Sequence, residues 1–148
     1  IQGSRVLLSE MQTKNILKQK KIFFNFLSAG LRNRKNAIHS NIFSLFFSKE
    51  DDYLHGIKTC NLAFYRQDCI RINGFNNNFE GWGREDSDFA SRLMNIGVKR
   101  KTLKFNAIQY HLWHKENNRE SLADNDEILK MAINGKLTWC DNGIDRYL

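Results

Sequence analysis

The chain has 148 residues, 41% hydrophobic and 26% charged, which suits one compact domain of mixed α and β structure. No stretch approaches the roughly eighteen consecutive apolar residues of a membrane-spanning helix, and the first residues lack the layout of a secretory signal. Cys60, Cys69 and Cys140 fit neither a disulfide framework nor a zinc motif, so we expect a reducing, cytoplasmic compartment.

The positive charge of the chain is concentrated in its first third. Residues 1–49 hold nine Lys and Arg against one acid, Glu10, whereas residues 50–148 hold fourteen against fifteen. Six of the eleven Phe also lie in the first third. We therefore expect two parts, a basic Phe-rich helical or irregular segment over 1–49 and a second part over 50–148.

Basic residues beside aromatic clusters allow three interpretations. The Phe side chains can pack inward while Lys and Arg stay in solvent, as at an ordinary domain edge. Residues 18–47 can instead make peripheral contact with the inner face of the cell membrane, where anionic headgroups attract Lys and Arg. Nucleic acid is the least favoured partner, because the remainder of the chain is near neutral and carries no recognisable nucleic-acid module.

Taken in chain order, the first elements are weakly marked. Residues 9–31 are compatible with a helix broken at Gly30, and residues 33–47 with a second helical or irregular segment. The apolar alternation over 58–66 predicts a strand, after which Asp68 is placed to cap a short helix.

The second half has clearer signals. Apolar residues recur at helical spacing from Glu85 to Ile96 and stop at Gly97, which predicts an amphipathic helix. The other expected elements, in order, are a turn at residues 73–74, a loop over 75–80, strands over 98–105 and 107–113, and a helix over 124–133. The fold class indicated is α/β, with a mixed sheet and flanking helices.

The chemistry concentrates in residues 79–89, where an indole stands between two glycines and three carboxylates open a helix. Gly81 and Gly83 let the backbone bend sharply, which frees Trp82 to offer the flat apolar face on which sugar rings stack. A helix N-terminus favours the negative charge of the carboxylates. A carboxylate beside such a platform is what a general base needs to deprotonate a hydroxyl group.

Two alternatives remain open for these carboxylates. Glu85, Asp86 and Asp88 can simply complement the helix dipole while Trp82 fills core. Asp86 and Asp88 also form an Asp-x-Asp pattern, as do Asp124 and Asp126, but both patterns are weak metal motifs because each opens a predicted helix.

A second concentration is the histidine pair at the end of the predicted strand over 107–113. Residues three apart on a strand face opposite sides, so His111 and His114 can share a metal only if the strand ends between them. One metal ligand is therefore favoured over two, and ordinary hydrogen bonding of both imidazoles is the alternative. His39 and His55 stand alone and rank lower.

Together, Gly-Trp-Gly-x-Glu-Asp at a helix start and Tyr-His about twenty-five residues later resemble the C-terminal half of a GT-A-fold glycosyltransferase. The similarity is to inverting family-two enzymes and to the galactosyltransferase and chondroitin-polymerase group, and it covers about residues 58–114. The stretch over 72–76 resembles the loop before that motif, with Asn73 and Asn76 where Gly and Asp are more usual.

The resemblance implies a role for each matched residue. Asp86 corresponds to the catalytic base, Glu85 to an acceptor-binding acid, and Trp82 with Gly81 and Gly83 to the acceptor platform. His111 corresponds to a ligand of the divalent metal, Mn or Mg, that holds the nucleotide diphosphate, and His114 is the fallback ligand. Arg84 stands where galactosyltransferase-like relatives have Gly.

The sequence thus leads us to expect a metal-dependent, inverting hexosyltransferase of polysaccharide biosynthesis. Its partners would be a nucleotide-sugar donor and a saccharide or lipid-linked acceptor, with no nucleic acid. The nucleotide-binding N-terminal half of the resembled fold is missing here, so we expect the chain to be a fragment that can be inactive alone. The alternative function is a non-catalytic carbohydrate-binding or partner-binding module.

Overall fold

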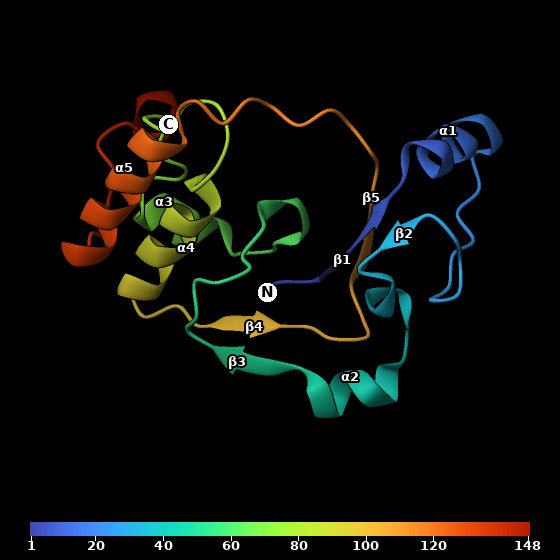
Figure 1. Ribbon diagram of the computed structural model, residues 1–148. Coiled ribbons are helices and arrows are strands. Elements are labelled where there is room, and N and C mark those ends of the chain that lie inside the picture. Colours follow the sequence, from blue (N-terminus) through green and yellow to red (C-terminus); the bar gives the residue numbers. More distant parts are fainter. The chain divides into compact units, whose positions relative to one another are not determined.

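The computed structural model describes all 148 residues and has mixed α and β structure (Figure 1). Its strands and α-helices are, in chain order, β1 (Ser4–Leu8), α1 (Glu10–Gln19), β2 (Leu31–Arg32), α2 (Asn41–Phe47), β3 (Lys49–Asp51), α3 (Arg66–Arg71), α4 (Glu85–Asn95), β4 (Arg100–Thr102), β5 (Ile108–His111) and α5 (Leu122–Asn134). Short 3₁₀ turns lie at Arg34–Ala37, Thr59–Asn61 and Asp145–Tyr147. None of the helices is long and apolar enough to cross a lipid bilayer.

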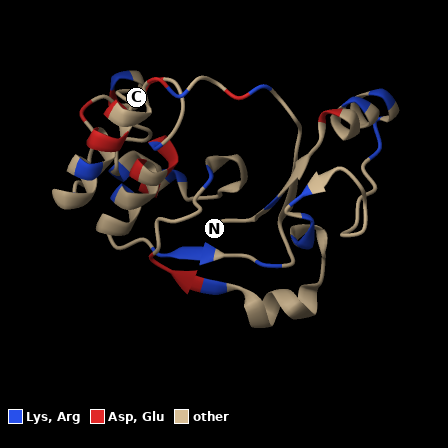
Figure 2. Cartoon of the chain, in the orientation of Figure 1, with Lys and Arg blue, Asp and Glu red and all other residues tan.

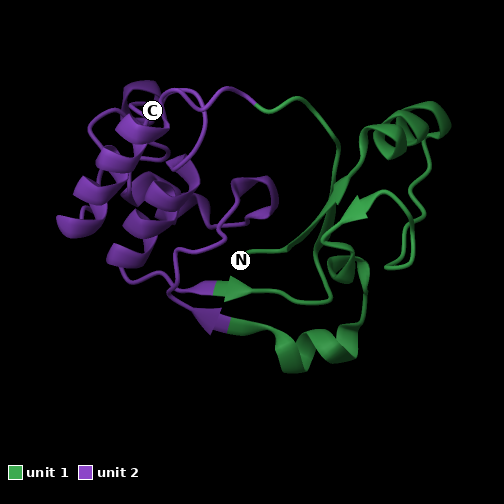
Figure 3. Cartoon of the chain, viewed as in Figure 1, with its two compact units in different colours: residues 1–49, 101–116 green, residues 50–100, 117–148 purple.

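The chain divides into two compact units (Figure 3). Unit 1 comprises residues 1–49 and 101–116, and unit 2 comprises residues 50–100 and 117–148. The first boundary coincides with the change in charge near residue 49. The expected division into 1–49 and 50–148 differs in one respect, because residues 101–116 return to unit 1 and pair with its first strand.

Unit 1 is built on a mixed sheet in the order β2, β1, β5. β1 runs antiparallel to β2 and parallel to β5, with Val6 opposite Tyr110 and Leu7 opposite His111. Alternate residues of β1 are buried, which is the period-two pattern of a strand with one face on a core. The expected mixed sheet is thus confirmed, and β1 and β2 add strands to a segment predicted to be helical or irregular.

The core of unit 2 forms around α4. Phe89 and Leu93 of this helix pack with Ile72, and the Phe89 ring stacks on Phe75 at 4.2 Å between centroids. Phe64 lies 4.9 Å from the same ring. Residues 89 and 93 share one face because they are four positions apart in a helix. The predicted helices over 85–96 and 124–133 are confirmed as α4 and α5.

The segment over 33–47, expected to be helical or irregular, contains a 3₁₀ turn and the helix Asn41–Phe47. Two other predicted elements need correction. The helix expected over 9–31 ends at Gln19, because Lys20 takes a left-handed conformation with φ of 52° and the chain then turns. The strand predicted over 58–66 does not form a ladder: its apolar side chains Leu62 and Phe64 pack on the α4 core instead.

The two later strands are present but shorter than predicted. β4 covers three residues and β5 four, because Phe105 and Ala107 adopt positive φ angles of 58° and 47° between them. β4 pairs with β3 in a separate two-stranded sheet. Arg100 of β4 binds Asp51 of β3 at 2.6 Å.

The C-terminal segment of unit 2 is fastened to the turn after α3. Asn73, fully buried with φ of 62°, donates from Nδ2 to the Cys140 carbonyl at 2.7 Å and to Asp145 Oδ1 at 2.8 Å. Its Oδ1 accepts from the Asp145 N–H at 2.8 Å. Asn tolerates the left-handed region better than most residues, so Asn73 can occupy a glycine-like position and also supply these bonds.

Because the C-terminal segment packs closely on Asn73, we expect Gly143→Ala to destabilise the protein strongly. A Cβ at position 143 would overlap the carbonyl oxygen of Asn73, and we expect a loss of about 3 kcal/mol or more in unfolding free energy. Urea unfolding measures it. Gly56→Ala is the matched control: it has positive φ but nothing within 4 Å, so it should cost only about 1–2 kcal/mol. Equal losses would contradict the packing described here.

Candidate functional site

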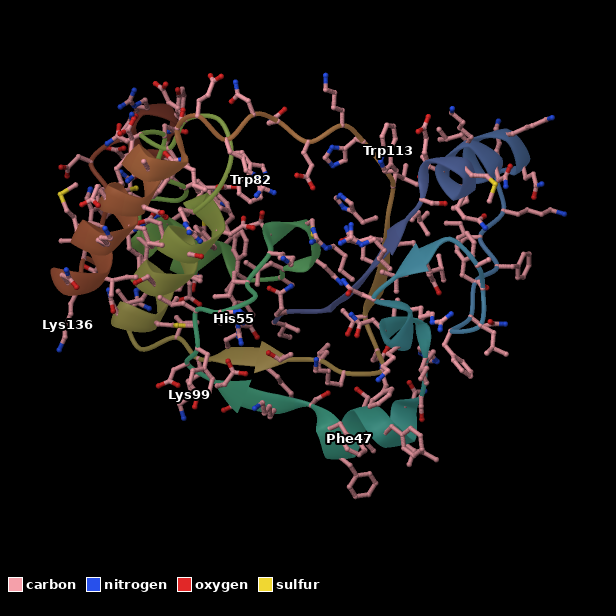
Figure 4. All side chains as sticks on the ribbon, in the orientation of Figure 1. Phe47, His55, Trp82, Lys99, Trp113 and Lys136 are labelled. Carbon is pink, nitrogen blue, oxygen red and sulfur yellow. The ribbon has the colours of Figure 1, made fainter.

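A sharply bent loop carries Trp82 to the start of α4. Gly81, Gly83 and Arg84 all have positive φ, at 68°, 103° and 82°. Glycine adopts such conformations without steric cost, which explains the two glycines beside the indole. Trp82 is 39% exposed, so the bend presents its ring at the surface rather than filling the core with it (Figure 4).

The first turns of α5 hold this loop in place. Asn125 is buried, and its Nδ2 donates to the carbonyls of Glu80 at 2.9 Å and Gly83 at 3.0 Å. The neighbouring Asp126 forms an ion pair with Arg84. Asn125 and Asp126, the last two residues of the Asp-Asn-Asp noted in the sequence as a weak metal motif, therefore position the loop. Sequence reasoning missed Asn125, whose only local signal is a polar residue within an apolar-periodic helix.

One of the three carboxylates at the start of α4 has a structural role. Asp88 is 1% exposed and binds Arg92, equally buried, at 2.7 Å. Arg92 also donates to the Ile72 carbonyl at 2.5 Å. Removing one member of such a buried pair leaves an uncompensated charge, which typically costs about 3–5 kcal/mol. The Asp88 carboxylate is therefore buried and paired with Arg92, so it is not available to bind a ligand.

Asp86 is placed differently. It is half-buried, and its Oδ1 accepts a hydrogen bond from Thr59 Oγ1 at 2.5 Å. Glu85, the residue before it, is also half-buried. Thr59 lies 27 positions earlier in the chain, in the 3₁₀ turn where a strand had been expected, and sequence reasoning did not identify it. The contact fixes one oxygen of the Asp86 carboxylate.

A cation lies over the indole. The guanidinium carbon of Arg119 is 4.3 Å from the centroid of the Trp82 ring, which is a cation–π contact. Sequence reasoning did not single out Arg119. Arg119 therefore covers part of one face of the Trp82 ring.

The histidine pair converges within unit 1. β5 ends at His111, so the alternation of the strand no longer applies to His114. The two Nε2 atoms are 3.1 Å apart, and the ring planes meet at 61°. The strand thus ends between the two histidines, which is the condition for both to face one ligand. His39 and His55 are exposed and lie outside this pair.

The surroundings of His111 favour its neutral form. Burial lowers the pKa of its imidazole below 6.5, and the positive charges of Arg5 and His114 lower this pKa further. A neutral imidazole keeps the lone pair that a metal ion or a hydrogen-bond donor needs.

The distance between the two Nε2 atoms can be compared with that expected for two ligands of one metal ion. Two imidazole nitrogens bound to one tetrahedral ion at about 2.0–2.1 Å are themselves roughly 3.3 Å apart, close to the separation observed here. No group of three His, Cys, Asp or Glu side chains that could hold a metal is found. The same 3.1 Å separation is that of a hydrogen bond between the two imidazoles, so the pair by itself does not make a metal site.

The predicted site residues fall into two groups. Trp82, Glu85 and Asp86, with the two glycines, belong to one loop and helix start in unit 2. His111 and His114 form the other group, in unit 1.

Comparison with protein families places both groups in one matched segment. The family described as "N-terminal domain of galactosyltransferase" matches residues 41–115, just over half of the chain. The chain belongs to this family, and its class is that of the glycosyltransferases, which are transferases. Comparison with curated proteins and with solved structures gives no match. The glycosyltransferase class expected from the sequence is confirmed.

We predict that His111 titrates below pH 6.5 and that the stability of the fold depends on it. Because the folded pKa is lowered, the folded state binds fewer protons than the unfolded state just below pH 6.5. Unfolding free energy should therefore fall as the pH drops through this window, and His111→Gln should flatten that dependence. NMR titration of the His111 Cε1 proton measures the midpoint directly, and a midpoint at or above 6.5 would refute the prediction.

Proposed function

We propose that the chain is the acceptor-binding and catalytic-base part of a GT-A glycosyltransferase of surface-polysaccharide assembly on the cytoplasmic side of the membrane. The enzyme would transfer a hexose or N-acetylhexosamine from a nucleotide-diphosphate sugar to a saccharide or lipid-linked acceptor, with inversion. One observation carries this proposal: Asp86, in the first turn of α4 and four residues after the exposed Trp82, has only one carboxylate oxygen bound by Thr59.

The proposed reaction is a single displacement. The second oxygen of Asp86 takes the proton of the acceptor hydroxyl while the hydroxyl oxygen attacks the anomeric carbon of the donor sugar. The bond from that carbon to the diphosphate oxygen breaks on the opposite face, and its electron pair leaves with the nucleotide diphosphate. The configuration at the anomeric carbon is therefore inverted.

The acceptor would be held by the loop and helix start around Asp86. Trp82 supplies an apolar ring against which the C–H face of a sugar packs. Glu85 supplies a carboxylate that accepts hydrogen bonds from sugar hydroxyls. Asn125 and Asp126 act indirectly, because they fix the loop that carries the indole. Precise positioning of this kind is a main source of rate enhancement in bimolecular reactions.

His111 and His114 would hold the divalent metal, Mn or Mg in our expectation from the sequence, together with oxygens of the donor diphosphate. When bound, the metal neutralises charge on the departing diphosphate. The protein contributes two nitrogen ligands held 3.1 Å apart, one of which is kept neutral by its surroundings.

The first test is Asp86→Asn. Loss of the base should lower turnover about 10²–10⁴-fold while acceptor binding is retained. The assay is transfer from a panel of nucleotide sugars in the presence of manganese, measured on the complete gene product and on residues 1–148.

Asp124→Asn is the matched control, since it makes the same chemical change in the first turn of α5. It should leave turnover unchanged. If neither protein transfers sugar yet both bind saccharide, the alternative of a non-catalytic carbohydrate-binding module is correct and the proposed catalysis is wrong.

The second test concerns the metal. Addition of Mn²⁺ should broaden the imidazole NMR signals of His111 and His114, and His111→Ala should weaken Mn²⁺ binding at least about tenfold because it removes one of two ligands. His39→Ala removes an exposed imidazole elsewhere in unit 1 and should leave the affinity unchanged. Equal broadening of all four histidines would contradict the assignment.

A further inference from the structure

The two units of the chain differ sharply in charge. Unit 1 holds twelve Lys and Arg against two acids, Glu10 and Glu116, and unit 2 holds eleven against fourteen. Unit 1 therefore carries a formal charge of +10, although the whole chain carries only +7. Figure 2 shows Lys and Arg spread along the segments of unit 1, whereas most Asp and Glu lie at β3 and near the starts of α4 and α5. A field of one sign on a folded unit attracts a partner of the opposite sign.

The last turn of α1 and the segment after it combine this charge with exposed apolar side chains. Lys18, Lys20 and Lys21 are all exposed. Phe23 is 87% exposed and Leu27 72% exposed, directly after the lysines in the chain. We call residues 18–27 the basic-apolar loop. Side chains of this size, exposed together, are typical of a binding surface rather than of ordinary solvent-facing loops.

The basic-apolar loop is fixed to the rest of unit 1. Phe24 is its inward-facing member: its ring lies 5.4 Å from that of Tyr110 on β5, and its carbonyl accepts from the Tyr110 hydroxyl at 3.2 Å. Beyond the loop, Gln12 of α1 donates to the Ala29 carbonyl at 3.0 Å, and the Ser9 N–H donates to the Gly30 carbonyl at 2.9 Å. The neighbours of Phe24 are therefore exposed on an ordered segment.

Helix α2 adds a second apolar area to the same unit. Leu45 is 82% exposed and Phe46 79% exposed, whereas Phe43 and Phe47 pack edge-on against Phe105 at 5.6 Å. Unit 1 thus presents several large apolar side chains in two places, among an excess of basic residues.

This combination selects among the possible partners. A nucleic acid would account for the lysines and, through stacking of its bases, for exposed Phe, but not for the exposed Leu27 and Leu45. A second copy of the chain would bring another +10 charge against the first and be repelled. An anionic lipid surface accounts for both features, because its headgroups attract lysine and its headgroup boundary accepts apolar side chains.

We propose that unit 1 docks on an anionic lipid surface through the basic-apolar loop, with lysines on the headgroups and Phe23 and Leu27 inserted at the boundary. The docking is independent of Asp86 and of sugar transfer. Its failure and the failure of the proposed function would therefore be seen in different assays.

The experiment is co-sedimentation of the complete gene product with vesicles of phosphatidylcholine alone or with phosphatidylglycerol added. Binding should require the anionic lipid and weaken as salt shortens the screening length from about 10 Å at 0.1 M to about 3 Å at 1 M. Each lysine contributes about fivefold to binding, so Lys18→Glu, Lys20→Glu and Lys21→Glu together should lower it at least about 100-fold.

Matched control variants distinguish an effect of the basic-apolar loop from an effect of net charge or of exposed apolar side chains in general. Lys99→Glu, Lys136→Glu and Arg146→Glu make the same charge change on exposed residues of unit 2 and should leave vesicle binding nearly intact. Phe23→Ser with Leu27→Ser should weaken binding at least about tenfold, because two inserted side chains are lost. Tyr65→Ser with Tyr147→Ser, equally exposed in unit 2, should not.

Four outcomes would overturn the proposal. They are equal binding to both kinds of vesicle, equal loss in the unit 2 controls, full binding by the Phe23 and Leu27 variant, and retention on DNA but not on anionic vesicles. Self-association that disappears with Phe23→Ser and Leu27→Ser would also overturn it, since the apolar side chains would then serve a second copy of the chain.

Discussion

The buried ion pair between Asp88 and Arg92 is the constraint on which the candidate site depends. Both side chains lie in the core of unit 2, and Arg92 also reaches the Ile72 carbonyl at the turn after α3. Charges taken out of water are tolerated only when they are paired and hydrogen-bonded. The pair therefore fixes α4 against that turn. Because residues advance by about 100° in a helix, Asp86 lies about 200° around the axis from Asp88 and cannot share its partner.

The same turn connects the core to the end of the chain. Ile72 accepts from Arg92, and the next residue, Asn73, binds the C-terminal segment at Cys140 and Asp145. At the N-terminal end of α4, Asn125 of α5 holds the loop that carries Trp82. The indole and the Asp86 carboxylate are thus placed by polar contacts that are at least partly buried, and breaking one of them would leave an unsatisfied group.

Much of unit 2 could be predicted from sequence because its signals are local. The spacing of Phe89 and Leu93 indicates α4, and two glycines around Trp82 indicate a sharp bend. The different roles of the carboxylates could not be predicted, since they depend on contacts with residues far away in the sequence. Asp88 is structural because its buried carboxylate accepts from Arg92, which also donates to the Ile72 carbonyl, and Asp86 is positioned by Thr59 from 27 residues away.

The strand predicted over 58–66 was wrong for the same reason, because local sequence signals do not show which distant residues a segment contacts. Its alternation of Leu62 and Phe64 is real, but a strand needs a neighbour, and here the alternate side chains pack on Phe89 instead. His111 and His114 converge for a related reason: β5 ends where its pairing with β1 ends, at Leu7 opposite His111. Periodicity describes which side chains are apolar, whereas the partner of a strand decides where the strand forms and stops.

Division of the chain into two units also explains why the charge of the whole protein is a poor guide to its surfaces. The segment over 101–116 adds three lysines and one acid to a first third that is already basic, because β5 joins the sheet of β1. Unit 1 thus gathers positive charge from two distant parts of the sequence, while the carboxylates of the candidate site lie in a unit with an acidic excess. Charge that repels an anionic surface and charge that attracts one are therefore carried by separate folded units.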